Sequence, residues 1–441
     1  YLTRSGRMDA ARARRLAPGF MAKYDAAALA STADPVDEVT ETSAAIGFSR
    51  LDHANCSVIL WDNLERNPDK VAVTGPAGSL TYAQLVAAAA QWGNAFLQFG
   101  LRRGDRIPFL LDDTPVYPAA FFGAVRAGLV PVLLNTQTNA ETLAYFLADT
   151  EARVVLCEAD LRGAFPEDIV AASGVEKIVI VNGGSEASGQ IRAEKFLQGM
   201  PTNLECADTS AGDMAFWMYS SGTTGRPKGI VHLHHDMAYT QHSYGRHVIG
   251  VRTEDVCLSI PKIFFAYGFG NSLTFPFSVG GTTVLLPGRP KPAAIFEAIS
   301  TWQPTIFFGL PTLYTALCNA PEAANNNLSS IRLSISAAET LSRDIYDSWK
   351  AIAGHGPTEG LGSTEMLHIY LSNTPDDHRI GAAGSPVPGY DIRLELPDGN
   401  EAVPGEEGVM LVRGDSSTPC YWRRPDKTAE TMRGGWIYTG D

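Results

Sequence analysis

The chain lacks paired cysteines, basic runs and long apolar stretches, and each absence excludes a class of protein. Its six cysteines are widely separated, without a Cys-x-x-Cys pair or a Cys/His spacing suited to zinc, so they are expected to be reduced packing residues. The net charge of −13 argues against nucleic acid or an anionic membrane as the main partner. The most apolar stretch, residues 116–134, is interrupted by Arg126 and two prolines, so no membrane span is predicted. Residues 1–22 contain no apolar signal-peptide core, and a cytoplasmic protein is expected by default.

With 441 residues, 45% of them hydrophobic, the chain can bury one large core or two to three smaller ones. Helix-like and strand-like segments alternate from residue 57 onward, with strands predicted over 71–74 and 177–181 and a helix over 82–99. This alternation indicates a mainly parallel sheet covered by helices on both faces, and its return after residue 236 predicts a second such sheet. After Gly381 we expect no further helix, only antiparallel strands and a hairpin turned by Pro-Asp-Gly.

The most informative segment is YSSGTTGRPKG, residues 219–229, because it combines hydroxyls, glycines and one lysine in a single loop. Glycines let backbone N–H groups point into one concavity, hydroxyls add donors, and a lysine suits a polyphosphate. Apolar segments on both sides predict two buried strands joined by this loop. A Walker-type loop is excluded, because Lys228 follows Pro227 and Gly229 stands where a magnesium-binding hydroxyl should be. The loop therefore predicts a nucleotide ligand.

Three histidines follow this loop: His232, His234 and His235. We expect them to lie along one strand, without a carboxylate or cysteine nearby. That arrangement favours a structural role at the end of a strand over metal binding.

Three motifs, in one order along the chain, resemble those of the adenylate-forming superfamily of acyl- and aryl-CoA synthetases, luciferases and peptide-synthetase adenylation domains. YSSGTTGRPKG is similar to its phosphate loop, GLGSTE (360–365) to its second nucleotide motif, and GWIYTGD (435–441) to its ribose motif. The resemblance covers about residues 52–441. It implies an α/β fold of two stacked, mainly parallel sheets flanked by helices, with a small distorted β-barrel. The implied domains are an N-terminal extension over 1–51, two α/β subdomains over 52–380 and the barrel over 381–441.

The resemblance also implies roles for individual residues. Lys228 and Thr364 would be catalytic groups at the phosphates, and Glu365 a catalytic ligand of Mg²⁺, for which one carboxylate suffices. Two of the acids have plainer alternatives: Glu365 as a surface acid at a helix start, and Glu359 as a solvated turn residue. The residues implied in ATP binding are Ser220, Ser221, Gly222, Thr223, Thr224, Gly225, Lys228, Ala337, Ala338, Glu339, Glu359, Gly360, Thr364 and Asp441.

Two further segments, KIFFAYGFGN (262–271) and STEMLHI (363–369), are similar to benzoate- and hydroxybenzoate-CoA ligases in particular. Phe265 stands where relatives that activate amino acids carry an aspartate for the substrate ammonium. Aromatic walls beside a small alanine suit a flat ring. His368 would meet a ring substituent, with a hydrogen-bonded core histidine as the alternative. The residues implied in binding the acid are Phe265, Ala266, Tyr267, Gly268 and His368.

The implied activity is that of an AMP-forming acid–thiol ligase. An aromatic acid and ATP would give an aryl-adenylate and pyrophosphate, and coenzyme A would then displace AMP. Family members continue beyond the ribose aspartate into a C-terminal domain that supplies a lysine for adenylation, whereas this sequence ends at Asp441. Two alternatives stay open: a ligase for aliphatic or phenylpropanoid acids, and a half-enzyme that binds nucleotide or acyl-adenylate without turnover. The expected partners are the acid, ATP and coenzyme A, and a homodimer stays open.

Overall fold

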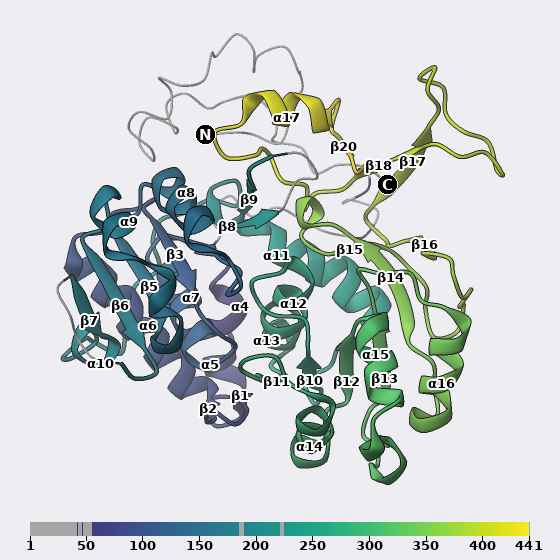
Figure 1. Cartoon of the computed structure of the whole chain (residues 1–441), viewed down its shortest axis with the longest axis horizontal. Coiled ribbons are helices and arrows are strands. Elements are labelled where there is room, and N and C mark those ends of the chain that lie inside the picture. The colour runs from purple at the N-terminus through teal and green to yellow at the C-terminus, as the bar shows by residue number, and fades with distance from the viewer. Residues whose placement is uncertain (1–41, 43–45, 47–54, 185–188, 221–224, 441) are drawn as a thin grey trace.

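The computed structural model describes residues 42, 46, 55–184, 189–220 and 225–440 (Figure 1). The strands of the described residues form three sheets. A seven-stranded sheet lies on the left of Figure 1, a nine-stranded sheet on the right, and helices lie between and around them. The predicted α/β class with mainly parallel sheets is confirmed. The predicted domain boundaries remain a prediction.

The seven-stranded sheet has the strand order β7-β6-β5-β3-β4-β8-β9 and is parallel except for the β8–β9 pair. Its longest helix, α6, begins at a capping box in which Thr81 and Gln84 bond to each other's backbone N–H, and ends at Gly100 with φ 95°. Its strands are β3 (Arg106–Leu110), β4 (Val130–Leu133), β5 (Val154–Glu158), β6 (Lys177–Val181), β7 (Gln190–Arg192), β8 (Met214–Ser220) and β9 (Lys228–Leu233). The helices around it are α6 (Tyr82–Phe99), α7 (Val116–Arg126), α8 (Ala140–Thr150), η2 (Ala159–Ala164), α9 (Glu167–Ala172) and α10 (Ala193–Phe196).

The nine-stranded sheet has the order β16-β15-β14-β13-β12-β10-β11-β1-β2, with antiparallel pairs at both edges. Its β1–β2 hairpin comes from the beginning of the described chain, and β1 pairs in parallel with β11. Its strands are β1 (Val71–Thr74), β2 (Leu80–Thr81), β10 (Val256–Ser259), β11 (Thr282–Val284), β12 (Ile306–Gly309), β13 (Leu333–Ser336), β14 (Thr358–Gly362), β15 (Ile369–Ser372) and β16 (Ser385–Pro386). The helices that follow its strands are α14 (Pro292–Trp302), α15 (Pro311–Cys318), η5 (Pro321–Asn325) and α16 (Arg343–Ala353).

An aromatic core joins the two large sheets. Phe269 packs against Phe121 of α7 and Phe216 of β8, with ring centroids 5.2 and 4.7 Å apart. Two of the segments in this region, η3 and η4, are π-helices, a form often found at functional sites. The segments are α4 (Val58–Trp61), α5 (Asn63–Arg66), α11 (His234–Thr240), η3 (Gln241–Ile249), α12 (Ala266–Phe269), η4 (Gly270–Thr274) and α13 (Phe275–Val279).

A four-stranded antiparallel sheet follows, and it contains the predicted hairpin. The expectation that helices stop after Gly381 is wrong, because α17 (Pro425–Thr431) precedes its last two strands. Pro425 stands at the start of α17, where its fixed φ suits a helix and no N–H is needed. No described helix is long and apolar enough to cross a membrane. The strands are β17 (Asp391–Glu395), β18 (Val409–Arg413), β19 (Met432–Arg433) and β20 (Trp436–Tyr438).

Candidate functional site

The predicted phosphate loop connects two paired strands. Ser220 ends β8 and Lys228 begins β9, and these two residues are partners in the antiparallel ladder. Gly225 has φ 130°, a value that favours glycine. The remaining predicted loop residues, 221–224, and the predicted ribose residue Asp441 lie outside the described residues.

Tyr421 links two of the predicted catalytic residues. The Lys228 ammonium lies 4.2 Å from the centroid of the Tyr421 ring, and the Tyr421 hydroxyl donates to Glu365 Oε1 over 2.8 Å. Tyr421 is placed there by a bridge to Ile230 of β9. Burial raises the pKa of Tyr421, so its hydroxyl stays protonated and can donate. Lys228 and Glu365, far apart in the sequence, thereby both contact one phenol, Lys228 at the ring and Glu365 at the hydroxyl.

Thr364 and Glu365 begin η6 (Thr364–Met366), directly after β14. His232 Nε2 lies 2.9 Å from the Thr364 carbonyl oxygen, and His232 Nδ1 lies 2.9 Å from Asp236 Oδ2. The carboxylate therefore orients the imidazole, and the imidazole fixes the backbone at Thr364. The second nucleotide motif is in this way attached to β9 beside the phosphate loop.

The expectation for the three histidines is wrong in two respects. Only His232 lies in a strand, whereas His234 and His235 begin α11, and a carboxylate, that of Asp236, is present among them. The helix begins here because Asp236 accepts the Leu233 N–H over 3.0 Å. The histidines are occupied by hydrogen bonds, such as that from the Cys56 N–H to His234 Nδ1, in keeping with a structural role. No group of three metal-ligating side chains occurs among the described residues.

The residues predicted around adenine lie directly after β13 and inside β14, where Glu359 pairs with Ser336 at the end of β13. Ala337 is buried, and Ala338 has the left-handed φ of 72°. Glu339 accepts the Thr312 N–H over 3.2 Å, and Glu359 Oε1 accepts the Leu341 N–H over 2.8 Å. Burial raises the pKa of Glu359 above its ordinary value.

Two serine hydroxyls in this region, Ser336 Oγ and Ser363 Oγ, are buried without a hydrogen-bond partner among the described residues. A buried hydroxyl without a partner is unfavourable by about 1–3 kcal/mol. A polar ligand would relieve this cost. Gly360 is closely packed, because a Cβ there would lie 2.9 Å from the Ile369 side chain.

His368 lies at the centre of a buried ring cluster. Its centroid is 4.7 Å from that of Phe275, 5.0 Å from that of Tyr244 and 5.6 Å from that of Tyr267. His368 Nε2 lies 3.2 Å from Asn271 Oδ1 in η4. This hydrogen bond is the one expected if His368 is a core histidine. Burial lowers the pKa of His368 to about 3, so the ring is neutral at physiological pH.

The other predicted acid-binding residues belong to the turn into α12. Ala266 is buried, and a Cβ at Gly268 would lie 2.1 Å from the Lys262 carbonyl oxygen. Phe265 is 50% exposed and packs against Phe264, with centroids 4.7 Å apart. Tyr267 is the member of this turn that contacts His368 directly.

Several residues of the site were not predicted from the sequence: Tyr244, Asn271, Phe275, His232 as a support for Thr364, and Tyr421. Asn271 alone lies within one of the ligase-like segments, KIFFAYGFGN, and that resemblance implies no role for it. The other contacts join residues far apart in the chain, and local periodicity carries no signal for them.

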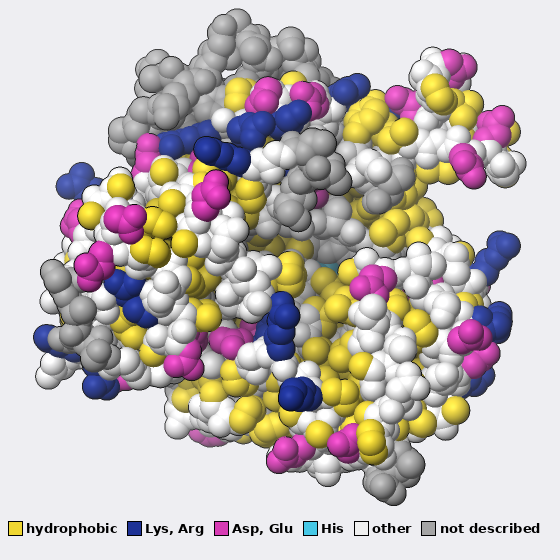
Figure 2. Space-filling model, in the orientation of Figure 1, with side chains coloured by type: hydrophobic (Ala, Val, Ile, Leu, Met, Phe, Trp, Pro, Cys, Tyr) yellow, Lys and Arg dark blue, Asp and Glu magenta, His cyan; other side chains and the backbone are white. Residues whose placement is uncertain are grey.

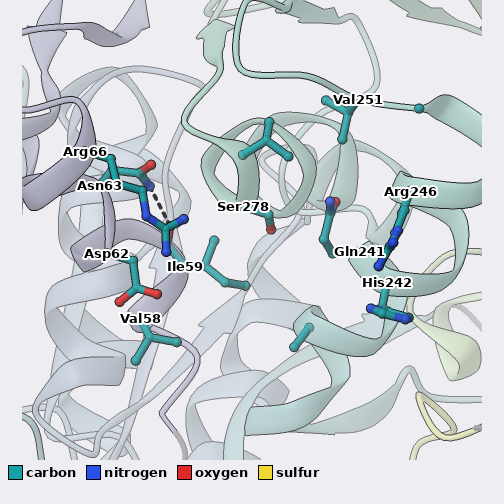
Figure 3. A pocket seen from close by; sticks show the side chains of 13 residues that line it. Val58, Ile59, Asp62, Asn63, Arg66, Gln241, His242, Arg246, Val251 and Ser278 are labelled. Carbon is teal, nitrogen blue, oxygen red and sulfur yellow. Dashed lines mark hydrogen bonds between the residues drawn. The ribbon is translucent and has the colours of Figure 1, made fainter. Parts of the chain in front are cut away.

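A separate cavity of about 430 Å³ lies between α4–α5 and η3–α13 (Figure 3). None of the predicted site residues lines it. Arg66 and Asp62 lie on one side of it and Arg246 and His242 on the other. It shares η3 with the ring cluster, since Gln241 lines the cavity and Tyr244 contacts His368.

The face shown in Figure 2 is hollowed between the two halves of the molecule. Lys and Arg side chains gather on its upper part, between the positions of α8 and α17 in Figure 1. This local positive charge occurs on a chain whose net charge is −13. Such a patch favours anionic ligands near the phosphate loop.

Comparison with known proteins gives a consistent picture. A model of the family described as AMP-binding enzyme matches residues 60–422. The benzoate–CoA ligase of Thauera aromatica is 39% identical over 374 residues, which cover 84% of this chain and 70% of that protein. The 4-hydroxybenzoate–CoA/benzoate–CoA ligase of Rhodopseudomonas palustris is 38% identical, over 84% of this chain and 69% of that protein. Among solved structures, the anthranilate CoA ligase AuaEII in complex with anthranoyl-AMP superposes with a TM-score of 0.87 and 34% identity, covering 91% of this chain and 77% of that one.

Proposed function

Because the chain belongs to the AMP-binding enzyme family, we propose that it activates an aromatic carboxylic acid of the benzoate type with ATP and passes the acyl group to coenzyme A. The enzyme is an AMP-forming acid–thiol ligase. The carboxylate oxygen attacks the α-phosphorus of ATP, the bond to the β-phosphate oxygen breaks, and pyrophosphate leaves. The thiolate of coenzyme A then attacks the acyl carbon and releases AMP.

One observation carries the choice of substrate class: a neutral histidine is buried among three aromatic rings a few residues from Thr364 and Glu365. His368 follows Glu365 after two residues, and 2% of its surface is exposed. Such a dry, ring-lined environment favours a flat apolar body, and we assign the neighbouring η6 residues to its carboxylate and to the phosphates. Relatives that act on benzoate and hydroxybenzoate, by their names, support the same class.

For the nucleotide, we assign the polyphosphate to the end of β8, the start of β9 and Lys228. The reaction brings two anions together, so its main requirement is charge neutralisation. Lys228 supplies a mobile positive charge at this point. Adenine is assigned to the turn of Ala337–Glu339, and a polar ligand would serve the buried hydroxyls of Ser336, directly before this turn, and Ser363, directly before η6.

The donor set also fits Mg²⁺ at Glu365. Tyr421 holds Oε1, and Oε2 receives no hydrogen bond from a described residue, so one carboxylate oxygen is left for a hard cation. When bound, the ion would neutralise charge on the phosphate oxygens. The Tyr421 hydroxyl would then orient the ligating carboxylate.

Calorimetry and isotope exchange test this proposal. We expect the protein to bind ATP and benzoate and to exchange labelled pyrophosphate into ATP in the presence of benzoate and Mg²⁺. A panel of benzoate, hydroxybenzoates, aminobenzoates, cinnamates and medium-chain fatty acids then defines the acid. A preference for fatty acids or cinnamates would replace the aromatic-acid proposal with the alternative ligase. Binding without exchange would support the half-enzyme alternative.

Loss of free thiol from coenzyme A reports the second half-reaction. Sedimentation of the purified protein tests whether it forms a homodimer, which the sequence leaves open. Fractionation of cells that express it tests the expected cytoplasmic location, which stays a prediction.

A further inference from the structure

An ionic cluster joins the carboxyl ends of the two large sheets beside the acid-binding turn. Asp112 and Asp113 follow β3 of the seven-stranded sheet, and Lys262 follows β10 of the nine-stranded sheet. The Lys262 ammonium lies 3.0 Å from Asp112 Oδ1 and 3.6 Å from Asp113 Oδ2. Asp113 is almost fully buried, and the Lys262 side chain is 13% exposed.

Backbone hydrogen bonds extend this cluster to the loop itself. Asp113 Oδ1 accepts the Ile263 N–H over 3.3 Å, so the aspartate holds both the side chain of Lys262 and the backbone after it. Lys262 donates to the Leu286 carbonyl, and Asp112 accepts the Gly288 N–H. Lys262 and Ile263 are therefore attached to the first sheet, and Lys262 also to the segment after β11.

Further hydrogen bonds hold the backbone of Asp112 in place. Glu158, at the end of β5, accepts the Asp112 N–H over 3.2 Å and also accepts from the Asn182 amide at 3.0 and 3.1 Å. Burial raises the pKa of Glu158 to about 7. The site proposed above uses none of these residues. A buried ion pair of this kind is weak as a source of stability, and its better-attested effect is to specify one arrangement.

The loop held by the cluster leads directly into the acid-binding turn. Phe265 N–H donates to the Lys262 carbonyl, and Gly268 packs against that same carbonyl. Any movement at Lys262 therefore passes to Ala266 and to Tyr267, whose ring centroid lies 5.6 Å from that of His368. The nucleotide groups on β9, β13, β14 and η6 have no bond to Lys262 or Asp113 among the described residues.

We infer that Asp113 and Lys262 form a positioning pair that sets the aromatic wall of the acid site and thereby controls affinity for the aromatic ring. The inference rests on the proposed function, because it needs the ring to bind at this wall. Neither residue contacts the substrate; both act through the turn that follows.

The test measures dissociation constants for 5′-O-(N-benzoylsulfamoyl)adenosine, a stable stand-in for benzoyl-adenylate, and for ATP. We expect Lys262→Met and Asp113→Asn each to weaken binding of the benzoyl compound about tenfold, with ATP binding changed less than about twofold, because small misplacement of a binding group is enough. Lys262→Arg keeps the charge and should recover part of the loss. The double variant should be no weaker than either single variant, because the two residues act as one unit.

Asp255→Asn is the matched control. Asp255 precedes β10, whereas Lys262 follows it, and Asp255 is a buried carboxylate paired with Arg332. This variant should lower the melting temperature and leave the ratio of the two dissociation constants unchanged. A ratio that stays at the wild-type value in Lys262→Met and Asp113→Asn would overturn the inference. A wild-type protein that binds ATP but not the benzoyl compound would instead overturn the aromatic-acid proposal.

The pH dependence of affinity for the benzoyl compound provides a second test, because a purely structural role of the pair would not change it. Burial raises the pKa of Asp113 to about 6; the charge of Lys262 lowers this pKa and that of Asp112 raises it further. Tyr117 and Glu158 are the other titratable groups beside this cluster. Protonation of Asp113 removes its attraction for the Lys262 ammonium. Wild-type affinity for the benzoyl compound should therefore fall as pH decreases through about 6, and Asp113→Asn should lack this step. An identical step in both proteins would count against the pair.

Discussion

The phosphate side and the acid side of the site lie at neighbouring strand ends but in opposite environments. On the phosphate side, the Lys228 and Glu365 side chains both contact the Tyr421 phenol. On the acid side, a neutral His368 is enclosed by aromatic rings. Acidic and basic residue types stand where a polyphosphate and a cation are proposed to bind, whereas a neutral ring stands where an apolar ring would replace water. Each of the following predictions alters one side and asks whether the other side responds.

The largest effect is expected from Glu365→Gln, which keeps the size of the side chain and removes its charge. The Mg²⁺ concentration needed for half-maximal ATP binding should rise about 100-fold, since a hard cation prefers an anionic oxygen. Binding of 5′-O-(N-benzoylsulfamoyl)adenosine should barely change. Calorimetric ATP titrations at a series of Mg²⁺ concentrations provide the measurement.

Tyr421→Phe sharpens this prediction, because it keeps the Glu365 carboxylate and removes only the hydroxyl that orients it. A rise of about tenfold in the Mg²⁺ requirement is expected, as for other supporting groups around a metal. If Glu365→Gln leaves the Mg²⁺ dependence as in wild type, the ion belongs to another ligand.

Lys228→Ala should weaken ATP binding by roughly 10- to 150-fold, the effect of losing a charge-assisted hydrogen bond worth about 1.5–3 kcal/mol. AMP lacks the β- and γ-phosphates, so its affinity should stay close to that of wild type. Lys427→Ala, on the surface of α17 and paired with Glu430, is the control for a simple loss of positive charge. Equal losses for ATP and AMP would show that Lys228 does not face the polyphosphate.

Ala266→Phe tests the acid side by overpacking it. A cost of about 1–3 kcal/mol should weaken binding of the benzoyl compound by roughly 5- to 150-fold and exclude substituted benzoates first. ATP affinity should remain nearly unchanged, because the change lies away from the phosphates. Ala266→Gly, which adds no bulk, should accept the full panel of acids. An acid profile that is the same in all three proteins would refute the proposed aromatic pocket.

The smallest effect concerns the pH dependence of stability. Burial lowers the pKa of His368 to about 3, so the unfolded chain takes up a proton below its ordinary pKa of about 6.5 and the folded chain does not. The stability that neutral His368 contributes is therefore present above pH 6.5 and lost as pH falls, by up to about 1.4 kcal/mol per pH unit. Between pH 7 and 5, denaturant unfolding of His368→Gln should show a smaller loss than wild type.

His234→Gln is the matched control, because burial lowers the pKa of His234 to about 3 as well, at a position outside the ring cluster. The two variants should reduce the pH dependence by similar amounts. An unchanged pH dependence in His368→Gln would mean that water reaches the ring cluster, and the contrast between a dry and a charged side would fail.

Local sequence patterns predicted the fold well where an element is defined by its own residues. The bounds of β1, α6 and β6 agree with the predicted ranges, because the two strands are short, mostly buried apolar runs and α6 carries its own cap. The motifs also led to residues that the structure brings together, such as Lys228 and Glu365. The predictions failed where an element is not defined by its own residues. His234 and His235 were expected in a strand, although they begin a helix at which Asp236 accepts the Leu233 N–H, and α17 lacks a buried face that periodicity could detect.

The supports of the site could not be predicted, because they depend on contacts between distant segments. His232 bonds to a residue 132 positions away, Tyr421 to one 56 away, and His368 to one 97 away. No spacing rule connects such pairs. The packing of the sheets decides them, and a single sequence does not reveal that packing.

The β1–β2 hairpin has a consequence for how the protein folds. Although it precedes the whole seven-stranded sheet in the chain, it completes the edge of the nine-stranded one, and Thr282 of β11 bonds to Val71 at a separation of 211 positions. During synthesis this hairpin must wait until β11 has left the ribosome, with the entire first sheet made in between. Such long-range closure slows folding and leaves a strand edge exposed meanwhile. The two large sheets consequently cannot be separated by a single cut in the chain. A fragment that ends at β9 would contain the β1–β2 hairpin without β11, its partner in the nine-stranded sheet. A fragment that begins at α11 would contain β11 without β1 and β2.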